Sequence, residues 1–267
     1  GETDGGLTVT TSLELDGGAN ASSSFDNRSI SIASEDMGTI TFSGHGGDTV
    51  MSGFDDMMPT AYEEVFALTK NKSDAATGAG NLTVAGQTAN NTWRYDSPSV
   101  GGAQFSVAYI SADTGTTAGR ISSYSDMGIK ISPEAVEGLT IGFATGEYDK
   151  SATTLGLDHS TMFATYAYGS MTVGYQSSEI DGPTAAASDE STSWAVSYAV
   201  SDDFSVSYGQ HEYEQGTNAN AQESSGFSAS YTMGGTSIKA AFNSTDNIRT
   251  TASNDEDSFE IAISFAF

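Results

Sequence analysis

The last eleven residues of the chain alternate between apolar and polar side chains without a break. Phe259, Ile261, Ile263, Phe265 and Phe267 take every second position, and Ser, Glu and Ala lie between them. Side chains of a β-strand point to opposite faces with a period of two, so the pattern predicts a strand with one apolar face. Soluble domains rarely end on their most apolar strand, whereas a β-barrel in a bilayer presents such a face to lipid.

The same alternation recurs along the chain. It is clearest around residues 7–15, 40–42, 105–109, 129–131, 139–143, 162–168, 171–175, 194–200, 204–208, 227–231 and 238–242. We count about 14 such segments, each near the ~10 residues that a tilted strand needs to cross a bilayer. The sequence therefore predicts an all-β fold, a transmembrane antiparallel up-and-down β-barrel, with residues 1–267 forming a single domain.

The connections between these segments alternate in length. Short links fall at residues 34–37, 97–102, 132–138, 169–170, 201–202 and 233–235, and long polar ones near 16–26, 112–120, 149–158, 179–191, 214–222 and 246–256. Short turns at one rim and long loops at the other are typical of membrane barrels. We expect both chain ends at the short-turn rim.

One connection, residues 44–90, is too long for an ordinary loop. Segments of this length without regular structure are usually functional or disordered. This one is rich in aromatic and apolar residues, and residues 62–68 could form a short helix. We expect the loop to pack into the barrel interior and to form its constriction.

Composition limits the classes of function. The chain has 35 acidic and 9 basic residues, a net charge of −26, and no Cys. Nucleic-acid binding needs a basic surface, so no nucleic-acid partner is expected. No phosphate-binding glycine loop or nucleophile elbow is present, which argues against an enzyme. No apolar run approaches the ~18 residues of a membrane helix, a test that a β-barrel evades because only every second residue faces lipid.

Several short segments resemble the general diffusion porins of the alphaproteobacterial (Rhodobacter-like) outer-membrane porin family. They are residues 1–7 (GETDGGL), 62–65 (YEEV), 93–98 (WRYDSP) and 102–109 (GAQFSVAY), together with the terminal Phe267. The resemblance implies a barrel of 16 strands, a homotrimer, and a third loop folded inward to narrow the pore. It also implies a location in the outer membrane of a Gram-negative bacterium and recognition of Phe267 by the outer-membrane assembly machinery.

The chain departs from the family at its beginning. In the family a Thr-Asp-Gly turn joins strands two and three, and here this turn lies at residues 3–5. Either the first two strands are missing from this sequence, which we favour, or the barrel has 14 strands. In the first case the strand that should pair with the C-terminal strand is also missing.

Pores select by the width and charge of their narrowest ring. We expect acids on the loop to face bases on the wall and to create a transverse field, although both sets could be ordinary solvated charges. Arg28 shares its face with Ile30 and Ile32, so it is lumenal only if a bulge intervenes or if it lies beyond the lipid band. The candidates are Asp55, Asp56, Glu63 and Glu64 on the loop and Arg94, Lys130, Lys239 and Arg28 on the wall.

Acidic residues also cluster in the long outer connections. Oxygen-rich clusters can bind Ca²⁺ or bridge to lipopolysaccharide phosphates through divalent ions. Asp255, Glu256 and Asp257 are the candidates, but no segment has EF-hand spacing, and solvated loops are the favoured interpretation. No other cofactor is indicated.

These observations favour a passive diffusion channel for small hydrophilic solutes and ions, weakly cation-selective because of its lumenal acids. Membrane lipid and lipopolysaccharide would be its surroundings. The alternative is a secreted or surface all-β adhesion or structural protein. The alternating connection lengths favour the channel.

Overall fold

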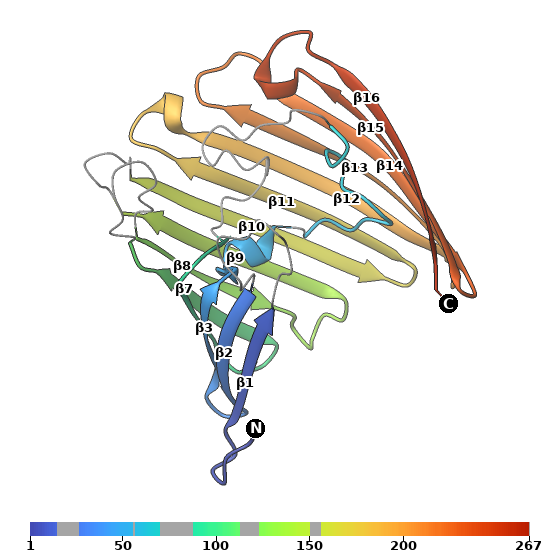
Figure 1. Cartoon of the computed structure of the whole chain (residues 1–267). Coiled ribbons are helices and arrows are strands. Elements are labelled where there is room, and N and C mark those ends of the chain that lie inside the picture. The colour runs from blue at the N-terminus through green and yellow to red at the C-terminus, as the bar shows by residue number, and fades with distance from the viewer. Residues whose placement is uncertain (15–26, 56, 70–87, 113–122, 150–155, 267) are drawn as a thin grey trace, which may run out of the picture.

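Fourteen antiparallel strands form one strongly curved sheet in the computed structural model (Figure 1). The structure describes residues 1–14, 27–55, 57–69, 88–112, 123–149 and 156–266. Each strand pairs with its neighbours in sequence, except that β6 follows β3 because β4 and β5 form a separate two-stranded ladder. The predicted up-and-down membrane-barrel architecture and its number of strands are confirmed; a count of 16 for a longer chain stays a prediction.

The strands fall into two groups by length. The short wall consists of β1 (Thr8–Glu14), β2 (Asn27–Ser34), β3 (Gly38–His45), β6 (Thr92–Asp96), β7 (Ala103–Ile110) and β8 (Tyr124–Ile131). The long wall consists of β9 (Leu139–Tyr148), β10 (Leu157–Tyr168), β11 (Met171–Asp181), β12 (Asp189–Ser201), β13 (Phe204–Gln215), β14 (Gln222–Met233), β15 (Thr236–Asp246) and β16 (Glu256–Phe265). The remaining elements are β4 (Gly47–Asp48), β5 (Thr88–Ala89) and the 3₁₀ turns η1 (Ser52–Phe54), η2 (Ala185–Ala187) and η3 (Ile248–Thr250).

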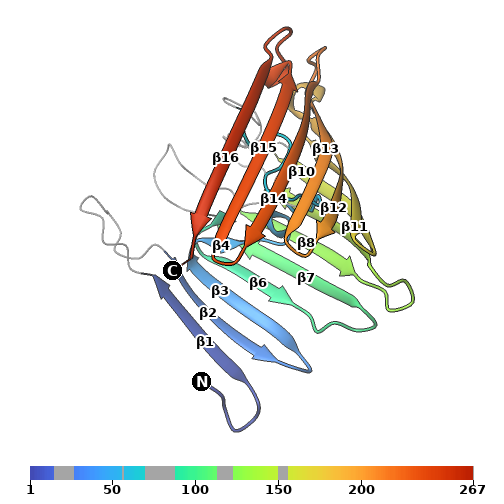
Figure 2. The ribbon, with the colours of Figure 1, turned by 90° about the vertical axis from the view of Figure 1, so that its right-hand side faces the viewer.

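The two ends of the sheet lie apart. Within the described residues β1 pairs only with β2 and β16 only with β15, and Figure 2 shows β1 and β16 as separate margins. Unpaired backbone groups are costly in lipid, so these two margins are the places where the described sheet needs a further partner.

The outer face of the sheet carries the apolar half of the alternation. Large side chains stay exposed on this face, among them Ile40, Trp93, Phe105, Phe143, Met162, Tyr175, Trp194, Phe227, Phe242, Phe259 and Ile261. Some pack across strands: the rings of Phe42 and Trp93 lie 4.6 Å apart. The inner face carries Ser, Thr, Gly and Ala at the intervening positions.

Strands of the long wall extend further than their apolar positions indicate. The connection expected at residues 179–191 is confined to residues 182–188, because β11 continues to Asp181 and β12 begins at Asp189. Glu190 of β12 and Glu214 of β13, which fall within the connections expected at residues 179–191 and 214–222, therefore lie in strands, and their assignment to loops was wrong. The alternation continues past the apolar band, but with polar side chains on both faces.

The buried core lies between the inner face of the sheet and the loop after β3. Val50, Met51 and Phe54 of the loop pack against Ala108, Ala144 and Phe163 of the wall. The rings of Phe54 and Phe163 meet edge to face, with centroids 5.2 Å apart. Full burial of each aromatic contributes about 1.5–3 kcal/mol. A second cluster joins Phe66 and Val65 of the loop to Tyr213.

The loop contains no α-helix in its described part. Residues 62–68, where a short helix was expected, form bends and a single turn. That prediction was wrong, because side chains of the wall bind the N–H groups of Ala61 and Tyr62 and the carbonyl oxygen of Glu64 and hold this segment as an irregular chain. The described residues also include no helix of the length and apolarity that a membrane crossing requires.

Candidate functional site

The loop between β3 and β6 is here called the inner loop (residues 46–91), and its residues 46–55 and 57–69 lie along the inner face of the wall. These parts pass over successive strands of the sheet (Figures 1 and 2). Near its beginning it contacts β6 and β8, and by Tyr62 it has reached β16. A loop laid flat on the wall narrows the enclosed space from one side.

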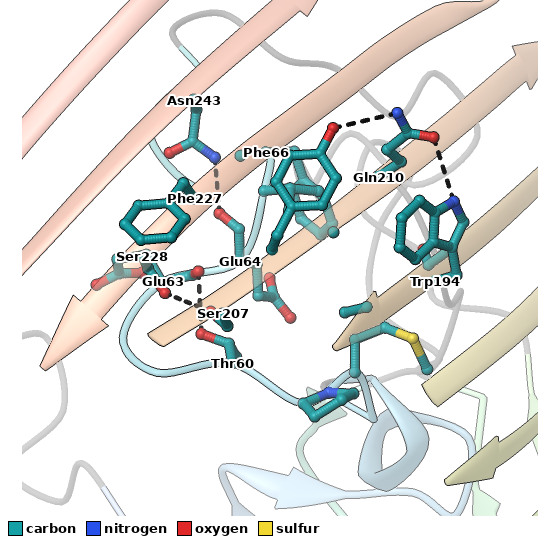
Figure 3. A pocket seen from close by; sticks show the side chains of 18 of the residues that line it. Thr60, Glu63, Glu64, Phe66, Trp194, Ser207, Gln210, Phe227, Ser228 and Asn243 are labelled. Atoms are coloured by element: carbon teal, nitrogen blue, oxygen red, sulfur yellow. Dashed lines mark hydrogen bonds between the residues drawn. The ribbon is translucent and has the colours of Figure 1, made fainter. Parts of the chain in front are cut away.

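Side chains of successive wall strands hold the main chain of the inner loop. Gln176 of β11 donates to the Phe54 carbonyl oxygen at 2.7 Å. Asn243 of β15 donates to the Glu64 carbonyl oxygen at 2.9 Å (Figure 3). The backbone N–H groups of Ala61 and Tyr62 donate to hydroxyl oxygens on β13 and β14, at 2.9 and 3.1 Å. These bonds satisfy main-chain groups of a segment that forms neither a helix nor a strand.

Small residues on the inner face let the loop approach the sheet closely. A Cβ atom at Gly174 would lie 2.5 Å from Cδ of Pro59, so any side chain there would displace the loop. The space left between loop residues 58–66 and strands β11–β15 is only about 30 Å³. That is room for one or two water molecules, so no larger solute fits between this segment and the wall.

The beginning of the inner loop is held by two charged side chains. Arg94 of β6 donates through Nη1 to the Thr49 carbonyl oxygen at 3.0 Å and pairs with Asp96 at 2.9 Å. Asp126 of β8 accepts the backbone N–H of Met51 at 2.8 Å. Arg94 lies on the inner face, as expected, but its carboxylate partner is on its own strand and not on the loop.

The far end of the described loop is held by a second polar cluster. The Tyr62 hydroxyl donates to Oε1 of Glu260 on β16, and Nζ of Lys239 lies 5.3 Å from the centre of the Tyr62 ring. Hydrogen bonding to Glu260, with a smaller contribution from the neighbouring Glu63, raises the pKa of Tyr62 to about 12. Tyr62 therefore stays a hydrogen-bond donor at neutral pH. Lys239 contacts the loop itself, as a cation against an aromatic ring.

The other two predicted bases lie away from the loop acids. Lys130 is exposed on β8 and makes no hydrogen bond or ion pair within the described part of the chain. Arg28 donates to the Gly44 carbonyl oxygen at 3.3 Å, next to a register shift between β2 and β3. The bulge considered for Arg28 is present, yet its side chain stays exposed on the same alternation as Ile30 and Ile32. Whether these bases shape a constriction stays a prediction.

Three of the four predicted loop acids are described. Asp55, Glu63 and Glu64 are half-buried and line the narrow space between the loop and the long wall, while Asp56 lies outside the described residues. Asp55 and Glu64 have partners of their own. The described part of the loop therefore brings three acidic side chains to this space.

The inner face of β1–β3 is different in chemistry. Cross-strand pairing aligns hydroxyl side chains in two rows, Ser12–Ser29–Ser43 and Thr10–Ser31–Thr41. No basic side chain lies on this alternation in the described residues. The second row continues to Arg94 on β6, and the transverse field between loop acids and wall bases stays a prediction.

The calcium candidates diverge in direction. Asp255 accepts the backbone N–H of Asn247 at 3.0 Å, and Glu256 accepts the Ser258 hydroxyl at 3.1 Å. Among the described residues no three acidic, His or Cys side chains lie close enough to hold a metal ion. Calcium binding stays a prediction.

Several residues that shape the site were not singled out from the sequence. They are Asp126, Phe163, Gln176 and Glu260, each on the inner-facing alternation of its strand. The alternation of inward and outward positions could have identified them, since a carboxylate, an amide or a Phe stands there on a face otherwise made of small side chains.

Comparison with known proteins identifies similar chains. The description "Gram-negative porin" matches residues 1–247. The anion-selective porin from Comamonas acidovorans is 15% identical over 99% of this chain and 86% of its own, with a TM-score of 0.67. An engineered variant of Rh. blastica porin is also 15% identical, over 100% and 87%, with a TM-score of 0.68. OmpT of Vibrio cholerae is 12% identical over 91% and 80%, with a TM-score of 0.60. A comparison with curated proteins gives no match. Structural likeness at such identities establishes the fold alone.

Proposed function

Because the chain belongs to the Gram-negative porin family, and is thus a passive outer-membrane channel and not an enzyme, we propose that it passes small hydrophilic solutes and weakly favours cations. Family membership favours this function over a surface adhesion protein. The observation that carries the cation preference is the concentration of carboxylates at the inner loop. Asp55, Glu63 and Glu64 line the narrow space between the loop and the long wall, and Glu260 of β16 adds a carboxylate that bonds Tyr62 next to Glu63.

The positions of the bases support the same preference. Arg94 is paired with Asp96, and Lys239 lies against the Tyr62 ring beside Glu260, so Lys130 on β8 is the predicted base that stays exposed on the inner face of the short wall. A lumen with excess carboxylates raises the local concentration of cations. This differs from the Comamonas porin, whose name describes anion selectivity.

The test is a reversal potential in a planar bilayer with a salt gradient. We expect ohmic steps and a potential that favours cations. Replacing Glu63 and Glu64 together by Gln should move the potential toward zero, whereas the outward-facing Asp158→Asn, which removes charge from β10, should leave it unchanged. A potential that favours anions in the unmodified protein refutes the acidic-pore proposal.

A homotrimer is the assembly that this function implies. Strands β3, β6, β7 and β8 have five to eight residues and still expose apolar outer faces. A strand of eight residues tilted by ~45° rises only about 19 Å, less than the ~25 Å apolar band of a membrane barrel. Contact with neighbouring copies would cover this short wall. An unheated detergent gel tests it: migration as a monomer argues against the trimer.

Contact with lipopolysaccharide is the last part of the proposal. On the outer face, carboxylates stand directly opposite one another in two rows, Glu179–Glu190–Glu214 and Glu212–Glu223–Asp246. Such a band cannot lie in hydrocarbon, and like charges in register repel, so it fits a head-group layer that contains divalent ions. Recognition of Phe267 by the assembly machinery stays a prediction, because Phe267 lies outside the described residues.

A further inference from the structure

We propose that Asp126 is the positioning residue that fixes the inner loop and so keeps the channel at one conductance. Asp126 does not contact the solute directly; it affects ion flow through the position of the loop. The inference rests on the proposed function, because its consequence is read as ion flow.

Asp126 is a buried carboxylate whose partners come from the loop and from its own strand. Only 4% of its surface is exposed. Oδ1 accepts the backbone N–H of Val50 at 3.2 Å, and Oδ2 accepts the N–H of Met51 at 2.8 Å. Tyr124, also buried, donates its hydroxyl to Oδ2 at 3.2 Å. Both oxygens of one side chain therefore hold consecutive main-chain groups 75 and 76 residues away.

The two N–H groups lie where the loop turns. Met51 immediately precedes the 3₁₀ turn Ser52–Phe54, whose first N–H groups have no partner within the turn. A carboxylate accepts both neighbouring N–H groups at once, which a neutral hydroxyl or amide cannot do as well. Asp126 thus fixes the position and the direction of this turn together.

Close contacts with β6 and β8 also restrict the position of the loop around Asp126. A Cβ atom at Gly128 would lie 2.8 Å from Cγ1 of Val50, so the loop rests directly on β8. Arg94 holds the Thr49 carbonyl oxygen from the other side. Three consecutive loop residues are thus clamped by side chains of opposite charge from β6 and β8, and Phe54 then enters the cluster around Phe163.

The path of the acidic segment follows from this clamp. Residues 55–64 begin one residue after the turn that Asp126 fixes, so a shift of the turn displaces Asp55 first and Glu63 afterwards. The main-chain groups of residues 54–64 make only single hydrogen bonds to neutral Ser, Gln and Asn side chains of the wall, and the Tyr62 side chain adds one bond to Glu260. These bonds are weaker than a carboxylate that holds two N–H groups. Loss of the clamp therefore frees the loop to occupy more than one position.

The experiment compares single-channel recordings of the unmodified protein with those of Asp126→Asn in planar bilayers. Asn keeps the shape but leaves one loop N–H without an acceptor. We expect the time spent outside the main conductance level to rise about tenfold, the population change that one lost buried hydrogen bond produces. The gel mobility of the unheated protein should not change, which separates loop release from unfolding.

Asp158→Asn is the matched control, because it removes the same charge from the outer face of β10. If the control and Asp126→Asn both record like the unmodified protein, the positioning role is refuted. If the unmodified protein gives no channels at all, the proposed function fails and not this inference alone.

Hydrogen exchange gives a second measurement that needs no variant. In the unmodified protein the amides of Val50 and Met51 should exchange more slowly than the amide of Glu63, for which the structure gives no acceptor among the described residues. Equally fast exchange of all three overturns the inference even if Asp126→Asn does not fold.

Discussion

The long wall and the short wall are parts of one sheet, yet they differ in strand length and in what covers their inner faces. Long-wall strands have 10 to 13 residues and are lined on the inside by the loop. In the short wall, β6–β8 hold only the beginning of the loop, and β1–β3 present rows of hydroxyl groups. In this protein the longer strands are the ones whose inner face is covered by the loop.

Length decides what each wall can face on the outside. A strand of 12 residues tilted by ~45° rises about 28 Å, enough to cross the apolar band, whereas eight residues rise about 19 Å. The long wall can therefore face lipid over its full height. The short wall exposes equally apolar side chains over less height, and we assign it to contact with other copies.

The largest expected effect tests the lining of the long wall. Phe163→Ala removes a buried ring under the loop and should lower the free energy of unfolding by about 3–5 kcal/mol. Thr41→Ala on the inner face of β3 should change it by less than about 0.5 kcal/mol. Urea titrations of the protein folded into vesicles measure both; equal effects would mean that the loop does not support the wall.

A pair of matched substitutions tests the outer faces. Val196→Arg on β12 and Val107→Arg on β7 both place a charge at mid-strand on the outer alternation. In the long wall the charge meets hydrocarbon and should cost about 2–4 kcal/mol of folding free energy without dissociating the assembly.

In the short wall the same charge should cost less in the folded monomer but dissociate the assembly. Unheated gels and vesicle folding distinguish the two results. If Val107→Arg leaves the trimer intact, the short wall is not the interface.

The smallest expected effect concerns the contact of the loop with β16. The pKa of Tyr62 is raised, so its hydrogen bond to Glu260 contributes fully below the ordinary tyrosine value of about 10. That contribution is lost as the pH rises through about 12, where tyrosinate would repel Glu260 and Glu63. We expect current noise to rise over this alkaline range in the unmodified protein. Tyr62→Phe, which has no hydroxyl proton to lose, should show no such rise in noise. A rise in both the unmodified protein and Tyr62→Phe would mean that another group titrates.

The strands were predictable from sequence because each apolar side chain reports its face independently of the others. The inward course of the loop was also predictable, from its length and its aromatic content. The partners of the charged wall side chains were not predictable. Arg94 and Asp96 lie two positions apart on one strand face, and this pairing competes with any acid across the lumen.

The ends of the long-wall strands escaped prediction for another reason. Beyond the apolar band both faces are polar, so the period of two loses its hydrophobic signal while backbone pairing continues, as it does at Glu190 and Glu212. The position of the loop on the wall could not be predicted from the sequence, because contacts such as that of Asp126 with Met51 join residues 75 positions apart.

The polar side chains of the wall bind mostly the backbone of the loop, while apolar loop side chains such as Phe54 and Phe66 pack against the wall. Gln176 and Asn243 bind carbonyl oxygens, and Asp126 binds N–H groups, none of which depends on which residue supplies them. Attachment and selectivity are thus encoded in separate parts of the sequence. Substitutions at Glu63 or Glu64 can change which ions pass while the loop keeps its course, so related channels can diverge in preference on an unchanged frame.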